Sequence, residues 1–306
     1  MTTASPPSAL VTGASSGIGR ATAVALRGAG YRVVGTCRDP EKITDPVDGV
    51  HYVALELGDL ASVEAAAAAT LAHLGDGETA GNDGETASDP GVNLTGGGTG
   101  TDRAGGGPAL DLLVNNAGES WAGSFEETDA ETLTHVFAVN VVGTVRLTQL
   151  LLPGMRARGR GHVVNVGSLL AEFPVGYRSA YVASKAALRG FTLAARQELG
   201  PLGIRMCLVE PAYYKTGVRV NRRIRRPAEG SSYAAGFAAV EKATAKGDDR
   251  AGDPADVAAV ILAIARDQDP APIHAVGRTE PYLLQARRLL SNRTVEKLMM
   301  RRYGLR

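Results

Sequence analysis

A tyrosine and a lysine, Tyr181 and Lys185, stand at the spacing i, i+4 a short way downstream of Ser168. Carbonyl reduction needs a proton donor that works near neutral pH, and a free tyrosine, with a pKa of about 10, is too weak an acid. A nearby ammonium favours the phenolate and lowers that pKa. The i, i+4 spacing places both side chains on one helix face, and so predicts an acid–base pair for carbonyl/alcohol chemistry. Taken alone, the pair is better explained as an exposed aromatic–cation contact on a helix, and Ser168 is compatible with a strand-end cap.

A glycine-rich turn, TGASSGIG from Thr12 to Gly19, follows an apolar run and precedes a helical pattern. Glycines let the backbone approach a pyrophosphate, and a helix N-terminus supplies unpaired N–H groups and positive potential. The spacing is G-x-x-x-G-x-G, a weak signal by itself, but the strand–turn–helix context strengthens it. We therefore predict that a dinucleotide contacts Gly13, Ser15, Ser16, Gly17, Ile18 and Gly19.

The next strand-like run ends in GTCRDP, from Gly35 to Pro40. An NAD site usually has an acid here that binds the ribose hydroxyls. Arg38 instead suits the extra phosphate of NADP and can stack near the adenine. Asp39 is expected to point away, because Asp-Pro often opens a turn. We predict NADP (NADPH) as the cofactor, with NAD less favoured and a surface arginine without a ligand as the alternative.

Short apolar runs alternate with helical patterns along the chain, which predicts a parallel sheet with helices on both faces. The expected strands are residues 9–12, 32–37, 50–57, 111–115, 162–166, 205–210 and 273–276. The expected helices are residues 17–28, 62–74, 129–158, 180–199 and 254–266. This order predicts an α/β, Rossmann-type doubly wound fold of about seven strands, as a single domain over residues 1–306.

Residues 75–108 interrupt this pattern with many glycines, few apolar side chains and a short repeat, DGETA, at 76–80 and 83–87. Such a segment cannot bury enough apolar surface to offset the entropy lost on ordering. We interpret it as a disordered insertion, with a binding role as the less favoured alternative.

The composition limits the partners and the compartment. Lys+Arg (33) nearly balance Asp+Glu (32), so the net charge of +1 gives no global bias toward nucleic acid. Cys37 and Cys207 lie in apolar runs and are interpreted as core thiols rather than a disulfide, which suits a cytoplasmic protein. The N-terminal residues lack the regions of a signal peptide, and no apolar run reaches about 18 residues, so no transmembrane segment is expected. The five histidines show no metal-ligand spacing, and no metal site is predicted.

The chain resembles the short-chain dehydrogenase/reductase family from about Leu10 to Gly277, apart from the glycine-rich insertion. TGASSGIG is similar to the family's cofactor turn, and NNAG at 115–118 to its motif after the fourth strand. Asn140, within VNVVG, matches the family's helix asparagine, and Ser168 with the Tyr181-x-x-x-Lys185 pattern matches its catalytic group. Together, in this order, the motifs are specific.

The resemblance implies roles for these residues. Tyr181 acts as general acid in reduction and base in oxidation, and Lys185 lowers its pKa and holds the nicotinamide ribose. Ser168 hydrogen-bonds the substrate oxygen, and Asn140 holds a water that links Lys185 to solvent. Further cofactor contacts are implied at Glu56, Leu57, Asn115, Ala117, Gly118, Pro211 and Thr216. A homodimer or homotetramer is implied as well.

Some positions depart from the family pattern, and two of them bear on the site. Glu56 stands where the family usually has an aspartate that contacts the adenine, and its side chain is one methylene longer. Pro211-Ala212 replaces the usual Pro-Gly, which removes easy access to positive φ, so we expect a different path for the loop that follows.

Residues 212–250 are predicted to form a substrate-covering loop. Its first part holds several basic residues and no acid, namely Lys215, Arg219, Arg222, Arg223, Arg225 and Arg226. They indicate either an anionic or phosphate-bearing substrate or simply solvated charge. An apolar wall for a hydrophobic ketone is expected from Leu169, Leu170, Phe173, Pro174 and Tyr177. Residues 282–306 are predicted to form a basic amphipathic helix packed on the domain, with docking on a membrane surface as the alternative.

These observations predict an NADP(H)-dependent oxidoreductase that interconverts a ketone or aldehyde and an alcohol, with Tyr181 as general acid/base. A small lipophilic substrate is favoured, and a 3-oxoacyl thioester reductase is the alternative within enzymes. A non-catalytic NADP-sensing regulator is the alternative from another class. The complete proton-donor group argues against it, because a sensor has no use for one.

Overall fold

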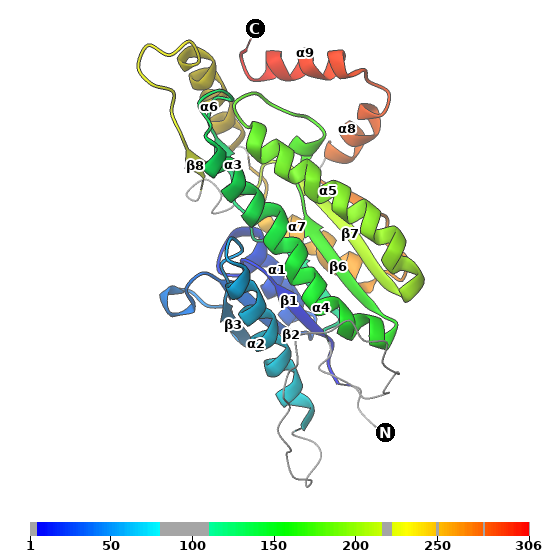
Figure 1. Cartoon of the computed structure of the whole chain (residues 1–306). Coiled ribbons are helices and arrows are strands. Elements are labelled where there is room, and N and C mark those ends of the chain that lie inside the picture. Colours follow the sequence, from blue (N-terminus) through cyan, green and yellow to red (C-terminus); the bar gives the residue numbers. More distant parts are fainter. Residues whose placement is uncertain (1–4, 80–109, 216–221, 249–250, 278, 306) are drawn as a thin grey trace.

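The computed structural model describes residues 5–79, 110–215, 222–248, 251–277 and 279–305. Its centre is a seven-stranded sheet in the order β3-β2-β1-β4-β6-β7-β9 (Figure 1), and every neighbouring pair is parallel. The strands are β1 (Ser8–Val11), β2 (Arg32–Cys37), β3 (Val50–Ala54), β4 (Leu112–Asn115), β6 (Gly161–Val166), β7 (Ile204–Pro211) and β9 (Ile273–Val276). The predicted Rossmann-type fold is confirmed, and all seven predicted strands are present.

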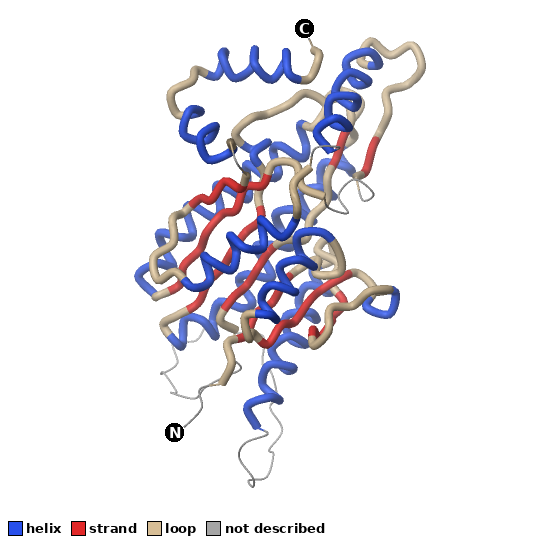
Figure 2. The backbone as a smooth tube through the Cα atoms, turned by 180° about the vertical axis from the view of Figure 1, so that it is seen from behind, coloured by secondary structure: helices blue, strands red, loops and turns tan. Residues whose placement is uncertain are grey.

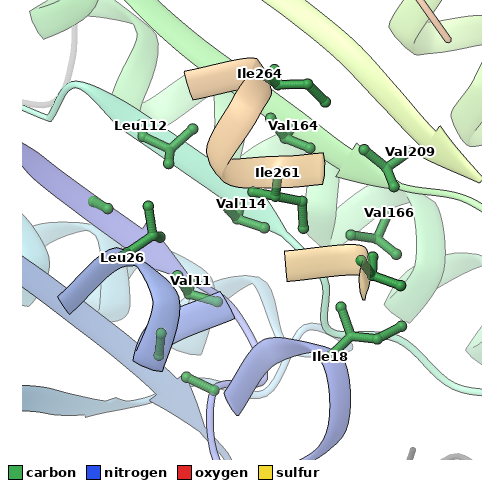
Figure 3. Packing of buried hydrophobic residues seen from close by; sticks show 14 of the residues in the cluster. Val11, Ile18, Leu26, Leu112, Val114, Val164, Val166, Val209, Ile261 and Ile264 are labelled. Atoms are coloured by element: carbon green, nitrogen blue, oxygen red, sulfur yellow. The ribbon is translucent and has the colours of Figure 1, made fainter. Parts of the chain in front are cut away.

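The sheet is buried on both faces because successive strand residues point to opposite sides and both sets are apolar. On one face, Val11 and Val114 pack in a cluster with Ile18 and Ile261 (Figure 3). On the other face, Leu10 packs in a second cluster that includes Leu113, Val163 and Leu147. Strand alternation thus builds one core on each side.

Helices cover both faces of the sheet (Figures 1 and 2). The helices α1 (Gly17–Gly28) and α7 (Pro254–Arg266) pack on the first cluster, and α2 (Leu60–Thr79), α4 (Thr144–Arg158) and α5 (Ser179–Leu199) on the second. The helix α2 ends at Thr79, so the first residues of the expected insertion are helical, whereas residues 80–109 lie outside the described part.

The long helix expected over 129–158 contains an irregularity. It consists of α3 (Ala130–Phe137), a π-helical segment (Ala138–Gly143) and α4. At the end of this segment, a Cβ on Gly143 would lie 2.0 Å from the Leu57 carbonyl oxygen, so the helix passes very close to the loop after β3. Single π turns of this kind often occur at functional sites. By length and composition Ala130–Arg158 is able to cross a membrane, but half of its apolar window is buried in the protein, as in a core helix.

Two segments contain more secondary structure than expected, namely the predicted loop at 212–250 and the predicted single helix at 282–306. Within 212–250, β8 (Arg223–Ile224) pairs with β5 (Trp121–Ala122), and α6 (Ala234–Asp248) follows, so this region is not only a loop. The C-terminal region is not one helix but two, α8 (Glu280–Arg287) and α9 (Asn292–Arg302). The break has a local cause: the Ser291 side chain accepts a hydrogen bond from Thr294 N and starts a new helix.

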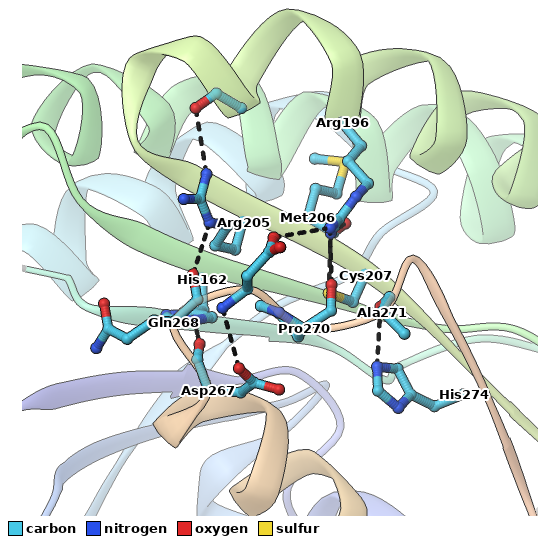
Figure 4. A network of polar contacts seen from close by, with 12 residues as sticks. His162, Arg196, Arg205, Met206, Cys207, Asp267, Gln268, Pro270, Ala271 and His274 are labelled. Carbon is cyan, nitrogen blue, oxygen red and sulfur yellow. Dashed lines mark hydrogen bonds and ion pairs between the residues drawn. The ribbon is translucent and has the colours of Figure 1, made fainter.

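The helices α6 and α9 join a third apolar cluster beyond the end of the sheet, formed by Val175, Val240, Val295, Met299 and Tyr303. The predicted packing of the C-terminal segment on the domain therefore agrees with the structure. At the opposite end of the sheet, a polar network fixes the chain before β9 (Figure 4): Arg196 donates to the carbonyl oxygens of Met206 (2.8 Å) and Pro270 (2.7 Å).

Candidate active site

A cavity of about 1590 Å³ runs along the edge of the sheet where the strands end. Its walls come from the segments that follow β1, β2, β3, β4, β6 and β7, together with parts of α5, α6 and the C-terminal helices. Ligands of open parallel sheets bind at this edge. The cavity therefore lies where the predicted site residues should meet.

The glycine turn after β1 forms one end of the cavity. Gly13 and Gly17 have φ values of +69° and +53°, and a Cβ on Gly19 would lie 2.2 Å from the Gly13 carbonyl oxygen. Only glycine fits this turn, which leaves the backbone bare towards the cavity. Ser16, at the N-cap of α1, makes no side-chain cap bond, so the first N–H groups of the helix remain available to an anion.

Five of the six residues predicted in this turn line the cavity: Gly13, Ser15, Ser16, Gly17 and Ile18. Gly19 does not, and its role is the close packing within the turn. The bare backbone, the open helix N-terminus and the cavity together fit the pyrophosphate of a dinucleotide.

At the end of β2, Arg38 lines the cavity, is exposed and makes no ion pair or hydrogen bond within the described part of the chain. Asp39 is absent from the lining, and its carboxylate lies 2.7 Å from Lys42 Nζ. The predicted orientation of Asp39 thus agrees with the structure. Glu56 and Leu57 also line this wall, and Glu56 Oε1 accepts a weak hydrogen bond from Gly58 N (3.3 Å).

Asn115 does not line the cavity. Its buried Nδ2 donates to Thr148 Oγ1 and to Asn165 Oδ1, both at 2.8 Å, and so ties β4 to β6 and α4. The next residue, Asn116, does line it and donates from Nδ2 to the Thr12 carbonyl oxygen (2.9 Å), which holds the glycine turn in place. Asn116 was not among the predicted residues, although it is the second asparagine of NNAG and that motif was a signal for it. Ala117, Gly118 and Pro211 line the cavity as well, whereas Thr216 lies outside the described residues.

Ser168, Tyr181 and Lys185 line the middle of this cavity together. Ser168 follows β6, and its Oγ accepts a hydrogen bond from Leu170 N (3.2 Å). Lys185 lies one helical turn after Tyr181 on α5. Lys185 Nζ donates to the Val166 carbonyl oxygen (3.0 Å), and burial lowers the pKa of Lys185 to about 8. The structure thus brings the three residues into one place.

Asn140 lies behind this group, in the π-helical segment, and is buried. Its Nδ2 donates to the Glu119 carbonyl oxygen (2.9 Å) and to Ser184 Oγ (3.0 Å), and its Oδ1 accepts from Glu119 N (2.8 Å). A Cβ on Gly118 would be 2.9 Å from Asn140 Oδ1 and 3.4 Å from Lys185 Nζ. Asn140 and Lys185 therefore both lie next to Gly118. The water that was predicted to link Lys185 to solvent stays a prediction.

Arg178 also lines the cavity, although its sequence context did not predict it. It directly precedes α5, and its Nη2 donates to Ser120 Oγ (2.6 Å). Its Cζ lies 5.2 Å from the centroid of the Tyr181 ring, within cation–π range. An arginine between a loop and a helix is typical of a surface position, so only its nearness to the Tyr-x-x-x-Lys pattern pointed to the site.

The substrate end of the cavity is partly apolar. Leu169, Leu170 and Phe173 line it as predicted, but Pro174 and Tyr177 do not. The C-terminal segment contributes further lining that sequence reasoning did not anticipate, namely Leu283, Leu298, Met299 and Tyr303. Tyr303 and Tyr213 hydrogen-bond through their hydroxyls (2.7 Å), and this contact joins the C-terminal segment to the end of β7.

The basic run after β7 divides into two groups. Lys215, Arg222 and Arg223 line the cavity. Arg225 pairs with Asp129 and Arg226 with Glu241, both away from the cavity lining. Arg219 lies outside the described residues. Other cations contribute instead from α6 and the C-terminal segment: Lys242, Lys246, Arg301 and Arg302.

A family model described as "short chain dehydrogenase" matches residues 7–77 and 104–227 of the chain. Among curated proteins, an uncharacterized oxidoreductase, YusZ of Bacillus subtilis (strain 168), is 31% identical over 274 residues, which covers 85% of each chain. A 3-ketodihydrosphingosine reductase of Bacteroides thetaiotaomicron is 27% identical over 266 residues, which covers 87% of this chain and 86% of the relative.

Among solved structures, a short-chain dehydrogenase from Streptomyces avermitilis superposes with a TM-score of 0.72 at 31% identity. The match covers 94% of this chain and 93% of that one.

Proposed function

The chain belongs to the short-chain dehydrogenase family and is an oxidoreductase, and we propose that it interconverts a ketone or aldehyde and an alcohol with NADP(H). One observation carries the proposal: Ser168, Tyr181 and Lys185 line the same cavity as the glycine turn and Arg38. A proton donor is thereby placed next to the site that fits a dinucleotide.

In this proposal the side chains handle the substrate oxygen and its proton. Tyr181 donates a proton to the carbonyl oxygen in reduction and accepts one from the alcohol in oxidation. Ser168 Oγ donates a hydrogen bond to the same oxygen and stabilises the charge that develops there. Lys185, whose pKa is near 8, is largely an ammonium at neutral pH and favours the phenolate form of its neighbour. The dinucleotide supplies or accepts the hydride when bound.

The choice of NADP over NAD rests on Arg38. Its guanidinium is at the cavity wall, without a partner within the described residues, and the acid beside it is engaged by Lys42. A fork of N–H donors in this position suits a 2′-phosphate, whereas a ribose diol would call for a carboxylate.

For the substrate, we favour a lipophilic carbonyl compound because leucine, phenylalanine and methionine side chains form the wall around Ser168. The ketone substrate in the name of the 3-ketodihydrosphingosine reductase relative is in keeping with this class. The second candidate, a 3-oxoacyl thioester, is favoured by the cations at the cavity rim, such as Lys215 and Arg302.

A homo-oligomer in the cytoplasm completes the proposal. The apolar side chains of Val142 and Phe191 are about half exposed on the outer helices. These side chains supply apolar surface for a second copy of the chain. The two cysteines are free thiols, as in proteins of a reducing compartment.

The test follows NADPH or NADH absorbance with purified protein and a panel of ketones, aldehydes and 3-oxoacyl thioesters. Tyr181→Phe is the control, because it keeps the ring and removes the proton. We expect oxidation of NADPH that is lost in the variant, and the best substrate decides between the lipophilic ketone and the thioester. Tight NADPH binding with no turnover on any compound would favour the NADP-sensing regulator instead.

A further inference from the structure

Arg178 is a buried cation that has no anionic partner within the described part of the chain. The residue is 6% exposed, and its side chain makes one hydrogen bond within the described ranges, to the neutral Ser120 hydroxyl. Its Nε–H is buried and has no acceptor. Arginines this deeply buried are usually paired with a carboxylate, because an unpaired buried charge is costly.

Among the described residues, the ionisable groups around Arg178 include a second cation and no carboxylate. Burial first, and then the positive charge of Arg222, hold the pKa of Arg178 below its usual range. The other groups that face it are the phenols of Tyr181, Tyr213 and Tyr303, and none of these is a carboxylate. Glu119, next to Ser120 in sequence, is engaged by His135 (2.8 Å) and Arg223 (3.2 Å).

An unusual backbone conformation holds this cation at the cavity. Tyr177, immediately before it, has φ +62° and is the one non-glycine residue with positive φ in the described ranges. Its carbonyl oxygen accepts a hydrogen bond from Gly123 N (2.9 Å), which stabilises that conformation. Strained backbone of this kind persists where the surroundings enforce it, often at functional sites. The next residue, Arg178, lines the cavity beside the Tyr181 ring.

We propose that Arg178 binds a carboxylate of the substrate, and that the enzyme acts on oxo acids or the corresponding hydroxy acids. This inference rests on the proposed function and adds the substrate class to it. The planar guanidinium suits a carboxylate, and an anion there takes the place of the partner that the described residues do not provide. The apolar wall holds the rest of an acyl chain.

The position of Arg178 also selects between two kinds of anion. The guanidinium lies against the ring of the proton donor, so the anionic group must be only a few bonds from the reacting carbonyl. A free oxo acid meets this condition. A thioester of a phosphate-bearing carrier does not, because its phosphate lies far along the carrier arm from the carbonyl.

The main test compares a β-oxo acid of medium chain length with its methyl ester. We expect Arg178→Met to lower the acid-to-ester ratio of kcat/KM by about 10- to 100-fold, the usual effect of losing a hydrogen-bonded charge pair. Arg226→Met is the matched control, since it makes the same substitution at a surface arginine that pairs with Glu241 and does not line the cavity. It should leave the ratio unchanged. An equal loss for acid and ester in Arg178→Met would overturn the proposal and assign Arg178 a role in supporting Tyr181 or the fold.

A binding measurement separates this proposal from the proposed function. The titrant is a saturated carboxylic acid of the same length, with its primary amide for comparison, added to the protein–NADPH complex in a calorimeter. We expect the acid to bind more tightly than the amide, and Arg178→Met to remove the difference. Arg178→Lys, which keeps the charge but not the fork, should keep part of it and covers a failure of the Met variant to fold.

The two measurements distinguish the failures. Preference for the carboxylate without turnover of any carbonyl compound would retain the subsite and reject the proposed function. Turnover of esters with no preference for the acid, in binding or in rate, would retain the proposed function and reject the subsite.

Discussion

The two halves of the cavity are built differently. The cofactor half uses backbone: glycines with positive φ, an open helix N-terminus and strand ends that the parallel sheet brings together. The substrate half uses side chains from the segment after β6, from α6 and from the C-terminal segment, which meet in an apolar cluster outside the sheet. Backbone geometry follows from local sequence and the sheet, whereas the substrate half depends on distant packing. Between the halves lies a shared centre, formed by Ser168, Tyr181 and Lys185. Changes in this centre should affect the reaction of every substrate, whereas changes in either half should affect the binding of one ligand only.

The largest effect is expected from Lys185→Met, in the shared centre. The variant removes the buried ammonium one helical turn after Tyr181, so kcat should fall by about 100- to 10,000-fold for acids, esters and simple ketones alike. Steady-state kinetics on these substrates check the prediction. A loss restricted to one substrate class would contradict the division into a common centre and separate halves.

The same variant should change how stability depends on pH. The pKa of Lys185 is about 8 in the fold, below its ordinary value near 10.5, because burial disfavours the charge. Between these values the unfolded chain binds more protons than the folded one, so this group makes stability rise as pH increases from about 8 to 10.5. Urea unfolding should show a rise of about 1 to 3 kcal/mol in the wild type relative to Lys185→Met. An equal pH dependence in both proteins would show that the lysine is not desolvated as described.

In the cofactor half, Arg38→Ala should weaken NADPH binding by about 10- to 30-fold and leave NADH binding within about twofold, because only NADPH has the extra phosphate. Fluorescence titration of each cofactor measures this. Lys42→Ala is the control, since it removes a neighbouring surface cation that pairs with Asp39. A similar loss for both cofactors would mean that Arg38 stacks on the adenine instead of binding the phosphate.

In the substrate half, the division of the basic run can be tested with two double variants. Arg222→Gln with Arg223→Gln removes cations at the cavity and should raise KM for an anionic substrate by about three- to tenfold, more at low salt. Arg225→Gln with Arg226→Gln removes cations that form surface ion pairs and should have little effect. Initial rates at two salt concentrations measure both, and equal effects would show that only the overall charge matters.

The residues that could be predicted from the sequence lie mainly in the cofactor half and the centre, and those that could not lie mainly in the substrate half. The glycine turn and Arg38 could be predicted because they follow strands of a parallel sheet, whose ends meet at one edge. Ser168, Tyr181 and Lys185 could be predicted from the family resemblance and from the i, i+4 spacing of the last two on a helix. Asn115 was assigned to the cofactor, but its amide is used between β4, β6 and α4, which no local pattern reveals. Arg178 and the C-terminal lining were missed, because their burial is decided by packing between distant segments.

The smallest effect is expected from Tyr303→Phe, which tests whether the C-terminal segment belongs to the substrate half. The variant removes one hydroxyl and its hydrogen bond to Tyr213 (2.7 Å) and keeps the ring in the apolar cluster. Loss of one such bond costs about 0.5 to 1.5 kcal/mol, so a small drop in Tm is expected. The bond joins the C-terminal segment to the end of β7, so substrate KM should change by a few fold while NADPH affinity stays the same. If NADPH affinity changed as much as substrate KM, the two halves would be coupled through this contact, and the C-terminal segment would act on the whole cavity.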